Sequence, residues 1–347
     1  MVRPHGQEPS APDVKEMVAV ATTALESSTK TPRGEHTLTL TVAGIHDEAD
    51  GVRSVTLANA DGSALPAWEP GSHIDITVAE GLTRQYSLCS DPSDLSSYRI
   101  GVLREPTSRG TSEYIHSTLA EGDTVTIVGP RNNFALAAAN RYIFIAGGIG
   151  VTPLIPMVAA AAASGADYQI VYGGRRKDSM AFVEELAAHG DRFVIWPEDE
   201  KGLIDLPGLL GEVHDDTLIY TCGPGPLLGA VENFSSHWPA GALHLERFTP
   251  KEIIVTDQLD EFEVELQASG ITLTIGPDTT ILEAAKGAGV DVFYSCSEGT
   301  CGSCETQIIE GEADHRDSVL SAAEQAENTC MMICVSRSKC SKLVLDL

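Results

Sequence analysis

The stretch SCSEGTCGSC, residues 295–304, places three cysteines close together in the last quarter of the chain. Four residues separate Cys296 from Cys301, two more precede Cys304, and a further 29 lead to Cys334. Iron–sulfur clusters are held by thiolates, and this spacing is the plant-type 2Fe–2S pattern. The small residues let the loop curl, so that backbone N–H groups can point at the sulfurs and stabilise a negatively charged cluster. These four cysteines are therefore predicted to hold a 2Fe–2S cluster.

Other interpretations of these cysteines stay open at this point. A zinc site usually shows paired arms of closely spaced cysteines, and Cys330 with Cys334 offers a second pair. Four purely structural thiols are another alternative. Cys330 and Cys340 are expected to be ordinary thiols. Eight cysteines in 347 residues are too sparse for a disulfide scaffold, which favours a reducing, cytoplasmic location.

Around the cysteines, residues 261–347 are expected to form a small α+β domain. Residues 262–266 and 271–275 alternate in polarity like a hairpin, residues 280–286 are typical of a helix, and 343–345 of a final strand. Residues 251–260 form a polar linker before this domain.

Residues 139–250 are expected to form an α/β domain. The continuous apolar run Tyr142 to Ala146 is typical of a strand buried on both faces. Helical stretches near 152–163, 179–189 and 226–234 alternate with further short strands. Such alternation indicates a parallel sheet with right-handed crossovers.

A glycine turn follows the first strand of this domain. It allows a backbone to approach a pyrophosphate, and the helix after it offers N–H donors and a positive dipole end. Tight packing alone also explains many such turns. The residues expected to bind the nucleotide here are Gly147, Gly148, Gly150, Thr152 and Pro153.

Two other segments end strands of the same sheet, where ligands of open parallel sheets bind. Cys222-Gly223-Pro224 would place Cys222 near a nicotinamide, although a small buried thiol before a turn is an equal alternative. Arg175 and Arg176 follow two glycines and would contact a nucleotide phosphate or ribose, or lie in a solvated loop.

Residues 35–138 show the period-two alternation of many short antiparallel strands, which indicates a small barrel. Arg84 and Tyr86 are two residues apart on one strand and are expected to face the same way. Arginine binds phosphate bidentately, and a tyrosine ring fits beside a flavin ring. The segment 108–112 precedes a helix near 113–119, with Ser112 as its expected cap and a second anion site.

Composition excludes several other classes of protein. The net charge of −27 disfavours nucleic acid and anionic membrane surfaces. No apolar run approaches the roughly 20 residues that cross a bilayer, and the amino terminus lacks the features of a secretory signal. Residues 1–34 are expected to be a flexible extension.

From residue 36 to the carboxyl end, the sequence resembles the phthalate dioxygenase reductase family, which supplies electrons to Rieske-type oxygenases. The matching segments are Arg84 to Cys89, Pro130-Arg131-Asn132-Asn133-Phe134, Ala146 to Pro153, Cys222-Gly223-Pro224, Cys296 to Cys304, Gly311 to Asp317 and Cys334 to Arg337.

The resemblance implies a multidomain fold with an antiparallel FMN-binding barrel, a parallel-sheet NAD domain and a plant-type ferredoxin domain of the β-grasp type. It also implies the residues that bind FMN: Arg84, Tyr86, Ser87, Arg109, Gly110 and Ser112. The family's Gly-Arg-Gly-Gly-Ser loop reads Ser108-Arg109-Gly110-Thr111-Ser112 here, which changes the expected phosphate geometry. Phe248 is expected to pack near the flavin ring.

The implied function is transfer of electrons from NADH through FMN and the cluster to a Rieske-type oxygenase or demethylase. No side chain is assigned as a catalytic acid or base, because the cofactors carry the chemistry. Residues 261–347 hold 15 acidic and 5 basic side chains, a balance of −10, which favours a partner with a basic docking face. The alternatives are a reductase of a cytochrome P450 or other acceptor, and a non-enzymatic redox-sensing or zinc-binding protein.

Overall fold

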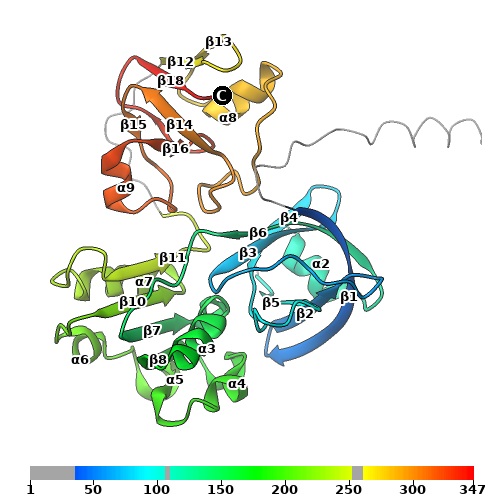
Figure 1. Ribbon diagram of the computed structural model, residues 1–347, viewed down its shortest axis with the longest axis vertical. Helices are drawn as coiled ribbons and strands as arrows, with labels where there is room; N and C mark the ends of the chain where they lie inside the picture. The colour runs from blue at the N-terminus through cyan, green and yellow to red at the C-terminus, as the bar shows by residue number, and fades with distance from the viewer. Residues whose placement is uncertain (1–35, 106–109, 252–260) are drawn as a thin grey trace, which may run out of the picture.

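The computed structural model describes residues 36–105, 110–251 and 261–347. They form three sheet-based units in chain order, coloured blue to cyan, green, and yellow to red in Figure 1. The expected extension 1–34 and most of the expected linker lie outside the described residues. No described helix has the length and apolarity that a membrane span requires.

The first unit is a six-stranded antiparallel sheet in the order β4-β3-β6-β1-β2-β5. An isolated bridge between Leu88, just after β4, and Ile100 on β5 brings the two edges together, as in a partly closed barrel. Alternate strand residues such as Leu40, Ile74 and Ile127 fill its core. Its elements are β1 (His36–Ala49), β2 (Val52–Ala58), β3 (Ser72–Ala79), β4 (Leu82–Ser87), β5 (Tyr98–Leu103), α2 (Thr111–Ser117) and β6 (Thr124–Asn132).

The start of α2 differs from the sequence prediction. Gly110, with φ 113°, occupies the N-cap position, and Ser112 lies within the first turn, buried. The prediction of Ser112 as the cap is therefore wrong. A left-handed residue ends the preceding segment, and glycine adopts that conformation without steric cost, so the helix begins before the serine.

The second unit is a parallel sheet in the order β11-β10-β7-β8-β9. Residues of β7 alternate between two cores: Phe144 and Ala146 face one, Ile143 and Ile145 the other. This explains the uninterrupted apolar run. The strands are β7 (Arg141–Gly147), β8 (Asp167–Gly174), β9 (Phe193–Pro197), β10 (Thr217–Cys222) and β11 (Leu243–Glu246).

Short helical segments connect these strands: η1 (Gly148–Val151), α3 (Leu154–Ser164), η2 (Lys177–Ser179), α4 (Val183–Ala187), η3 (Gly190–Arg192), α5 (Glu198–Lys201), α6 (Leu206–Leu210) and α7 (Gly225–Phe234). The helix expected over 179–189 is shorter than predicted. Phe182 interrupts it with φ 61°, and its buried ring packs beneath the Arg99 guanidinium and beside Gly101 of the barrel. Packing against the first unit therefore sets where α4 begins.

The third unit is a five-stranded sheet in the order β13-β12-β18-β14-β16, with a small β15-β17 pair beside it. The predicted hairpin is confirmed, with Phe262 opposite Ile275. Capping boxes begin both helices, Thr280 with Glu283 and Ser321 with Glu324. Its elements are β12 (Phe262–Leu266), β13 (Ile271–Ile275), α8 (Ile281–Gly287), β14 (Glu305–Glu310), β15 (Ala313–Asp314), α9 (Ala322–Glu327), β16 (Cys330–Met332), β17 (Arg337–Ser338) and β18 (Lys342–Leu345).

Candidate cofactor sites

The four predicted cluster cysteines gather between α8 and β14 on one side and after β16 on the other. The Cys296 thiol contacts those of Cys301 and Cys334, and these contacts lower its pKa. The Cys304 thiol also contacts Cys334, which lowers its pKa. All four thiols therefore form one connected group. Within the described residues, no set of three or more His, Cys, Asp or Glu side chains has the geometry to hold one metal ion.

Backbone N–H groups of the cysteine loop point at its sulfurs, as predicted. The amides of Glu298 and Thr300 donate to Cys296 Sγ at 3.3 and 3.4 Å, and the amide of Ser303 donates to Cys301 Sγ at 3.3 Å. Gly299 and Gly302 have φ values of 70° and 74°, which permits the tight curl. The loop therefore presents donors that stabilise thiolates and fit a cluster.

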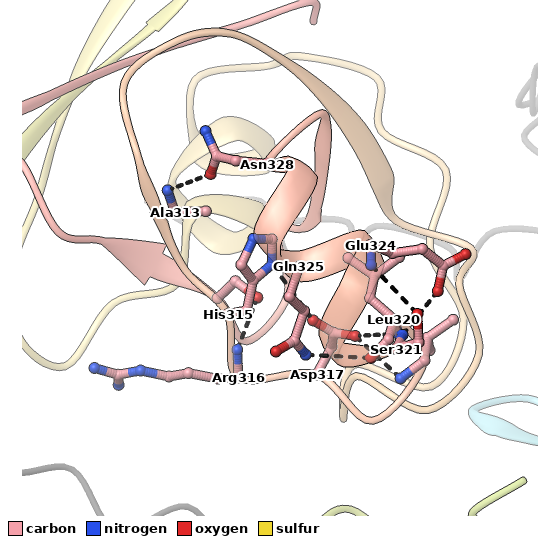
Figure 2. Close-up of polar contacts among 11 residues, drawn as sticks. Ala313, His315, Arg316, Asp317, Leu320, Ser321, Glu324, Gln325 and Asn328 are labelled. Carbon is pink, nitrogen blue, oxygen red and sulfur yellow. Dashed lines mark hydrogen bonds and ion pairs between the residues drawn. The ribbon is translucent and has the colours of Figure 1, made fainter. Parts of the chain in front are cut away.

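A buried polar turn around Asp317 contacts the cysteine loop, and Figure 2 shows the polar contacts within and next to this turn. Asp317 Oδ1 accepts hydrogen bonds from the amides of Val319 and Leu320, and His315 Nδ1 lies 3.8 Å from Asp317 Oδ2. Burial raises the pKa of Asp317, but these partners outweigh it and hold the pKa below its usual value. The amide of Ser318 then donates to the Gly299 carbonyl at 2.8 Å, so this turn fixes the loop that carries the ligands.

All three units border one pocket. The barrel, the end of β11 and the cysteine loop all contribute side chains to its wall. The lining residues are His73, Thr83, Arg84, Gln85, Ser87, Asn133, Leu245, Glu246, Arg247, Phe248, Ser295, Cys296, Glu298, Thr300, Ser318 and Val319. One predicted cluster ligand, Cys296, thus faces the same space as the predicted flavin residues Arg84, Ser87 and Phe248.

The wall of this pocket holds several buried polar atoms that lack a hydrogen-bond partner among the described residues. They are His73 Nε2, Gln85 Nε2, Ser87 Oγ and Glu246 Oε2, although the Ser87 hydroxyl lies close enough to the Glu246 carboxyl to act on its pKa. A buried polar group without a partner is costly, and a bound ligand that offers the matching donor or acceptor removes this cost. An isoalloxazine edge carries both donors and acceptors, and the donor and acceptor types gathered here fit it.

Glu246 and His73 are the two titratable groups among these, and the pKa of each is strongly shifted. Burial raises the pKa of its carboxyl to about 8. Cys222 lies near it, fully buried at the end of β10, and burial together with the Glu246 charge raises the pKa of its thiol. Burial also lowers the pKa of His73 to about 3, with Arg131 acting in the same direction. All three groups are therefore neutral at pH 7.

The glycine turn after β7 packs against the segment after β10. A Cβ on Gly150 would lie 2.4 Å from the Cys222 carbonyl carbon, and one on Gly147 would lie 2.7 Å from Pro224 Cδ. Of the three glycines in this turn, only Gly148, with φ 53°, has open space where a Cβ would lie. Strand order reverses between β7 and β10, which is where open parallel sheets bind ligands. Packing thus accounts for two of the glycines, and close approach of a ligand remains the prediction for the third.

The other predicted site residues are spread around this arrangement. Tyr86 packs partly buried against the barrel core and does not line the pocket, unlike Arg84. Arg175 is exposed after β8, and Arg176 pairs with Asp50 at 3.4 Å. Thr152 is buried and its hydroxyl donates to the Ile149 carbonyl, while Pro153 precedes α3. Gly110 packs on Leu82 of β4. Arg109 lies outside the described residues.

Comparison with known proteins identifies the chain. Residues 264–339 match the family model of the 2Fe-2S iron-sulfur cluster binding domain. Phenoxybenzoate dioxygenase subunit beta of Ectopseudomonas oleovorans is 41% identical over 87% of this chain and 96% of its own length. Vanillate O-demethylase oxidoreductase of Pseudomonas sp. (strain HR199 / DSM 7063) is 38% identical over 86% and 96%.

Among solved structures, phthalate dioxygenase reductase aligns with a TM-score of 0.66 and 35% identity, over 90% of this chain and 98% of that one. The chain belongs to the phthalate dioxygenase reductase family. An intact type IV self-sufficient cytochrome P450 monooxygenase aligns with a TM-score of 0.83 and 43% identity. There the alignment covers 90% of this chain but only 41% of the monooxygenase, so this chain spans less than half of that protein.

Family membership confirms the predicted fold class and the three cofactors, FMN, NADH and a 2Fe–2S cluster. It also removes the zinc-binding regulatory alternative. Several pocket residues were not predicted individually. Gln85 and Asn133 lie inside motifs quoted for the resemblance but have no role of their own there, and His73 and Glu246 lie outside those motifs. Their unpartnered or interdomain polar atoms become visible only once the three units lie together.

Proposed function

We propose that this chain is the reductase component of an oxygenase system, which delivers electrons from NADH to a Rieske-type aromatic oxygenase or demethylase. The observation that carries this proposal is the shared pocket: a cluster cysteine, the barrel residues and the end of the parallel sheet border the same space. Bound FMN would accept two electrons from NADH and release them singly to the cluster. Cytoplasmic location is part of the proposal, supported by eight free cysteines.

The barrel residues would hold the flavin. The Arg84 guanidinium would bind the phosphate. Tyr86 lies on the same strand, β4, and Gly110 and Ser112 lie at the start of α2. Arg109 is proposed for the same role from the family resemblance. Gln85 Nε2 would donate to the flavin ring, and Ser87, whose hydroxyl lies beside the Glu246 carboxyl, lines the same wall. Phe248, with 41% of its surface exposed, would lie over the ring and exclude water.

The parallel sheet would hold NADH across the switch point between β7 and β10. Gly148 leaves room for the pyrophosphate, and N–H groups of the turn that begins at Gly147 would donate to it. Cys222, Gly223 and Pro224 would border the nicotinamide. Arg175 would lie near the adenosine ribose, and the acidic residues Glu198 to Glu200 next to it favour NADH over NADPH by repelling a 2′-phosphate.

The acceptor would dock on the cluster side of the third unit. The net side-chain charge of −10 on residues 261–347 favours a partner with a basic face. Salt weakens this attraction. Raising ionic strength is therefore expected to slow reduction of the oxygenase while leaving reduction of the flavin by NADH unchanged. Equal rates at low and high salt would remove the electrostatic docking claim.

A cytochrome P450 is the second candidate acceptor. The 43% identity with part of a self-sufficient P450 monooxygenase favours it. Purified, cluster-loaded reductase can be mixed with NADH and either a Rieske oxygenase or a P450, and substrate turnover followed. Turnover with the Rieske enzyme alone supports the first proposal, and turnover with the P450 alone supports the second.

The reductase function itself is tested by spectroscopy. The purified chain is expected to show flavin bands together with broad iron–sulfur absorption, both bleached by NADH without oxygen. Acid release of the flavin distinguishes FMN from FAD, and parallel assays with NADPH test the nucleotide preference. A colourless chain, or one that NADH leaves unchanged, would overturn the proposal.

A further inference from the structure

Asn133 joins the shared pocket to the cluster loop. It follows β6 of the barrel and lines the pocket, and its Nδ2 donates a hydrogen bond of 2.9 Å to the carbonyl of Cys301, a cluster ligand. We propose that Asn133 is a positioning residue, which holds the cluster loop against the flavin pocket and thereby sets the rate of electron transfer between them. This inference rests on the proposed reductase function.

The contact is tight on the side of the cluster loop. A Cβ on Gly302 would lie 2.6 Å from Asn133 Nδ2, so only glycine leaves room for the amide. Gly302 also has φ 74°, which the curl of the loop requires. Because Asn133 as a whole is exposed, the hydrogen bond rather than core packing makes this contact.

Residues next to Asn133 and next to the cluster cysteines also bring the barrel and the cluster loop together. The Arg131 guanidinium lies 5.9 Å from the centre of the Phe293 ring, which is three residues before Cys296. His73 of the barrel is close enough to Cys296 for the two to interact electrostatically, and both line the pocket. Asn133 therefore belongs to a contact zone between the barrel and the cluster loop, and it makes the direct hydrogen bond there.

A second link reaches the loop from the other side. The amide of Lys251, after the parallel sheet, donates to Ser318 Oγ at 2.9 Å, and Ser318 is bonded to Gly299 of the cluster loop. The loop is thus held by both units, and removal of the Asn133 contact should loosen it without releasing it.

The step concerned moves one electron from the reduced flavin to one ferric ion, which becomes ferrous. No bond forms or breaks at Asn133, and no proton moves there. Electron transfer slows steeply as the gap between carriers widens. Losing one hydrogen bond of ordinary strength should lower the docked population, and with it the rate, by about five-fold.

The test compares Asn133→Ala and Asn133→Asp with wild type and with Asn140→Ala. Asn140 is a matched control, because it is also exposed and its Nδ2 donates one hydrogen bond, to Asp216 Oδ2 at 3.1 Å, away from the cluster loop. Asn133→Asp keeps the size of the side chain and removes the donor. Iron content is measured first, and rates refer to the cluster-loaded fraction.

Anaerobic stopped-flow mixing with NADH gives the rates of flavin reduction and of cluster reduction in the same variant. The ratio of cluster reduction to flavin reduction should be about five-fold lower in both Asn133 variants and equal to wild type in Asn140→Ala. Amide hydrogen exchange over residues 299–304 should quicken in those two variants and stay unchanged in Asn140→Ala.

Cluster reduction and hydrogen exchange like wild type in both Asn133 variants would overturn the proposal. Faster exchange without a slower electron transfer would also overturn it, since the contact would then be structural only. Failure of the reductase function is a different result: wild type itself would then show no bleaching by NADH.

Discussion

The cluster loop and the shared pocket serve the same electron path but are built in opposite ways. In the cluster loop, residues 296–304, the sulfurs receive N–H donors from their own segment. In the pocket, three units supply the wall, and several buried polar atoms lack partners among the described residues. The loop is therefore a local unit, whereas the pocket depends on tertiary contacts. Substitutions in the cluster loop should therefore remove the cluster. Substitutions around the pocket should disturb the alignment of the three units and lower the free energy of unfolding.

Replacing a cluster ligand should have the largest effect. In Cys304→Ala the cluster should be lost, because each ligand thiolate completes the coordination of an iron. Electron delivery to the oxygenase should fall to background, while NADH still bleaches the flavin. Iron analysis and the visible spectrum check the first expectation, and oxygenase turnover checks the second.

Cys330→Ser is the matched control in the same unit, since Cys330 lies on β16 and is not a predicted ligand. It should keep the cluster and full delivery. A Cys304→Ala chain with wild-type iron would contradict the assigned ligands.

The barrel next to the pocket should be sensitive to charge removal. Arg131 and Asp75 form an ion pair of 2.6 Å with side chains 8% and 4% exposed. Asp75→Asn removes the carboxylate that pairs with the buried Arg131 guanidinium, which should lower the free energy of unfolding by about 3–5 kcal/mol. Denaturant titration of the free energy of unfolding checks this. Glu265→Gln breaks the exposed pair with Lys342 and should cost at most about 1 kcal/mol. Equal losses in the two variants would refute the contrast.

The nucleotide turn offers a test of packing between β7 and β10. In Gly150→Ala the new methyl group would meet the Cys222 carbonyl, so the two segments must separate. We expect a loss of about 1–3 kcal/mol in the free energy of unfolding and a higher KM for NADH. Thermal unfolding and steady-state kinetics measure these. Gly229→Ala, exposed on α7 with open space, should instead stabilise by about 0.5–1 kcal/mol. A normal KM in Gly150→Ala would show that the turn tolerates the methyl group.

The most gradual expected effect is a pH dependence from Glu246, because each single pH unit changes the free energy of unfolding only modestly. Its folded pKa of about 8 exceeds the ordinary 4.5, so the folded chain keeps a proton that the unfolded chain releases. Stability without flavin should therefore fall as pH rises from about 4.5 to about 8, by about 1 kcal/mol per pH unit, and level off above that range. Glu246→Gln should remove this slope, as urea unfolding at several pH values would show. Parallel curves for both chains would contradict the assignment.

Local patterns allowed the cluster ligands and the three sheet types to be predicted. The spacing of Cys296, Cys301 and Cys304 lies within one loop, and the run from Tyr142 to Ala146 reports burial on both faces directly. The predicted cap of α2 was wrong, because Gly110 rather than Ser112 occupies the N-cap position. Interdomain groups such as Asn133 could not be assigned a partner from sequence, because the Cys301 carbonyl is 168 residues away along the chain.

The most direct test of the account is an anaerobic titration of the cluster-loaded chain with NADH. Each NADH brings two electrons, the flavin takes two and the cluster takes one, so bleaching should end at about 1.5 equivalents per chain. The Cys304→Ala chain should end at about 1.0 equivalent. A wild-type endpoint of about 1.0 with an unbleached cluster would contradict an electron path from NADH through the flavin to the four cysteines.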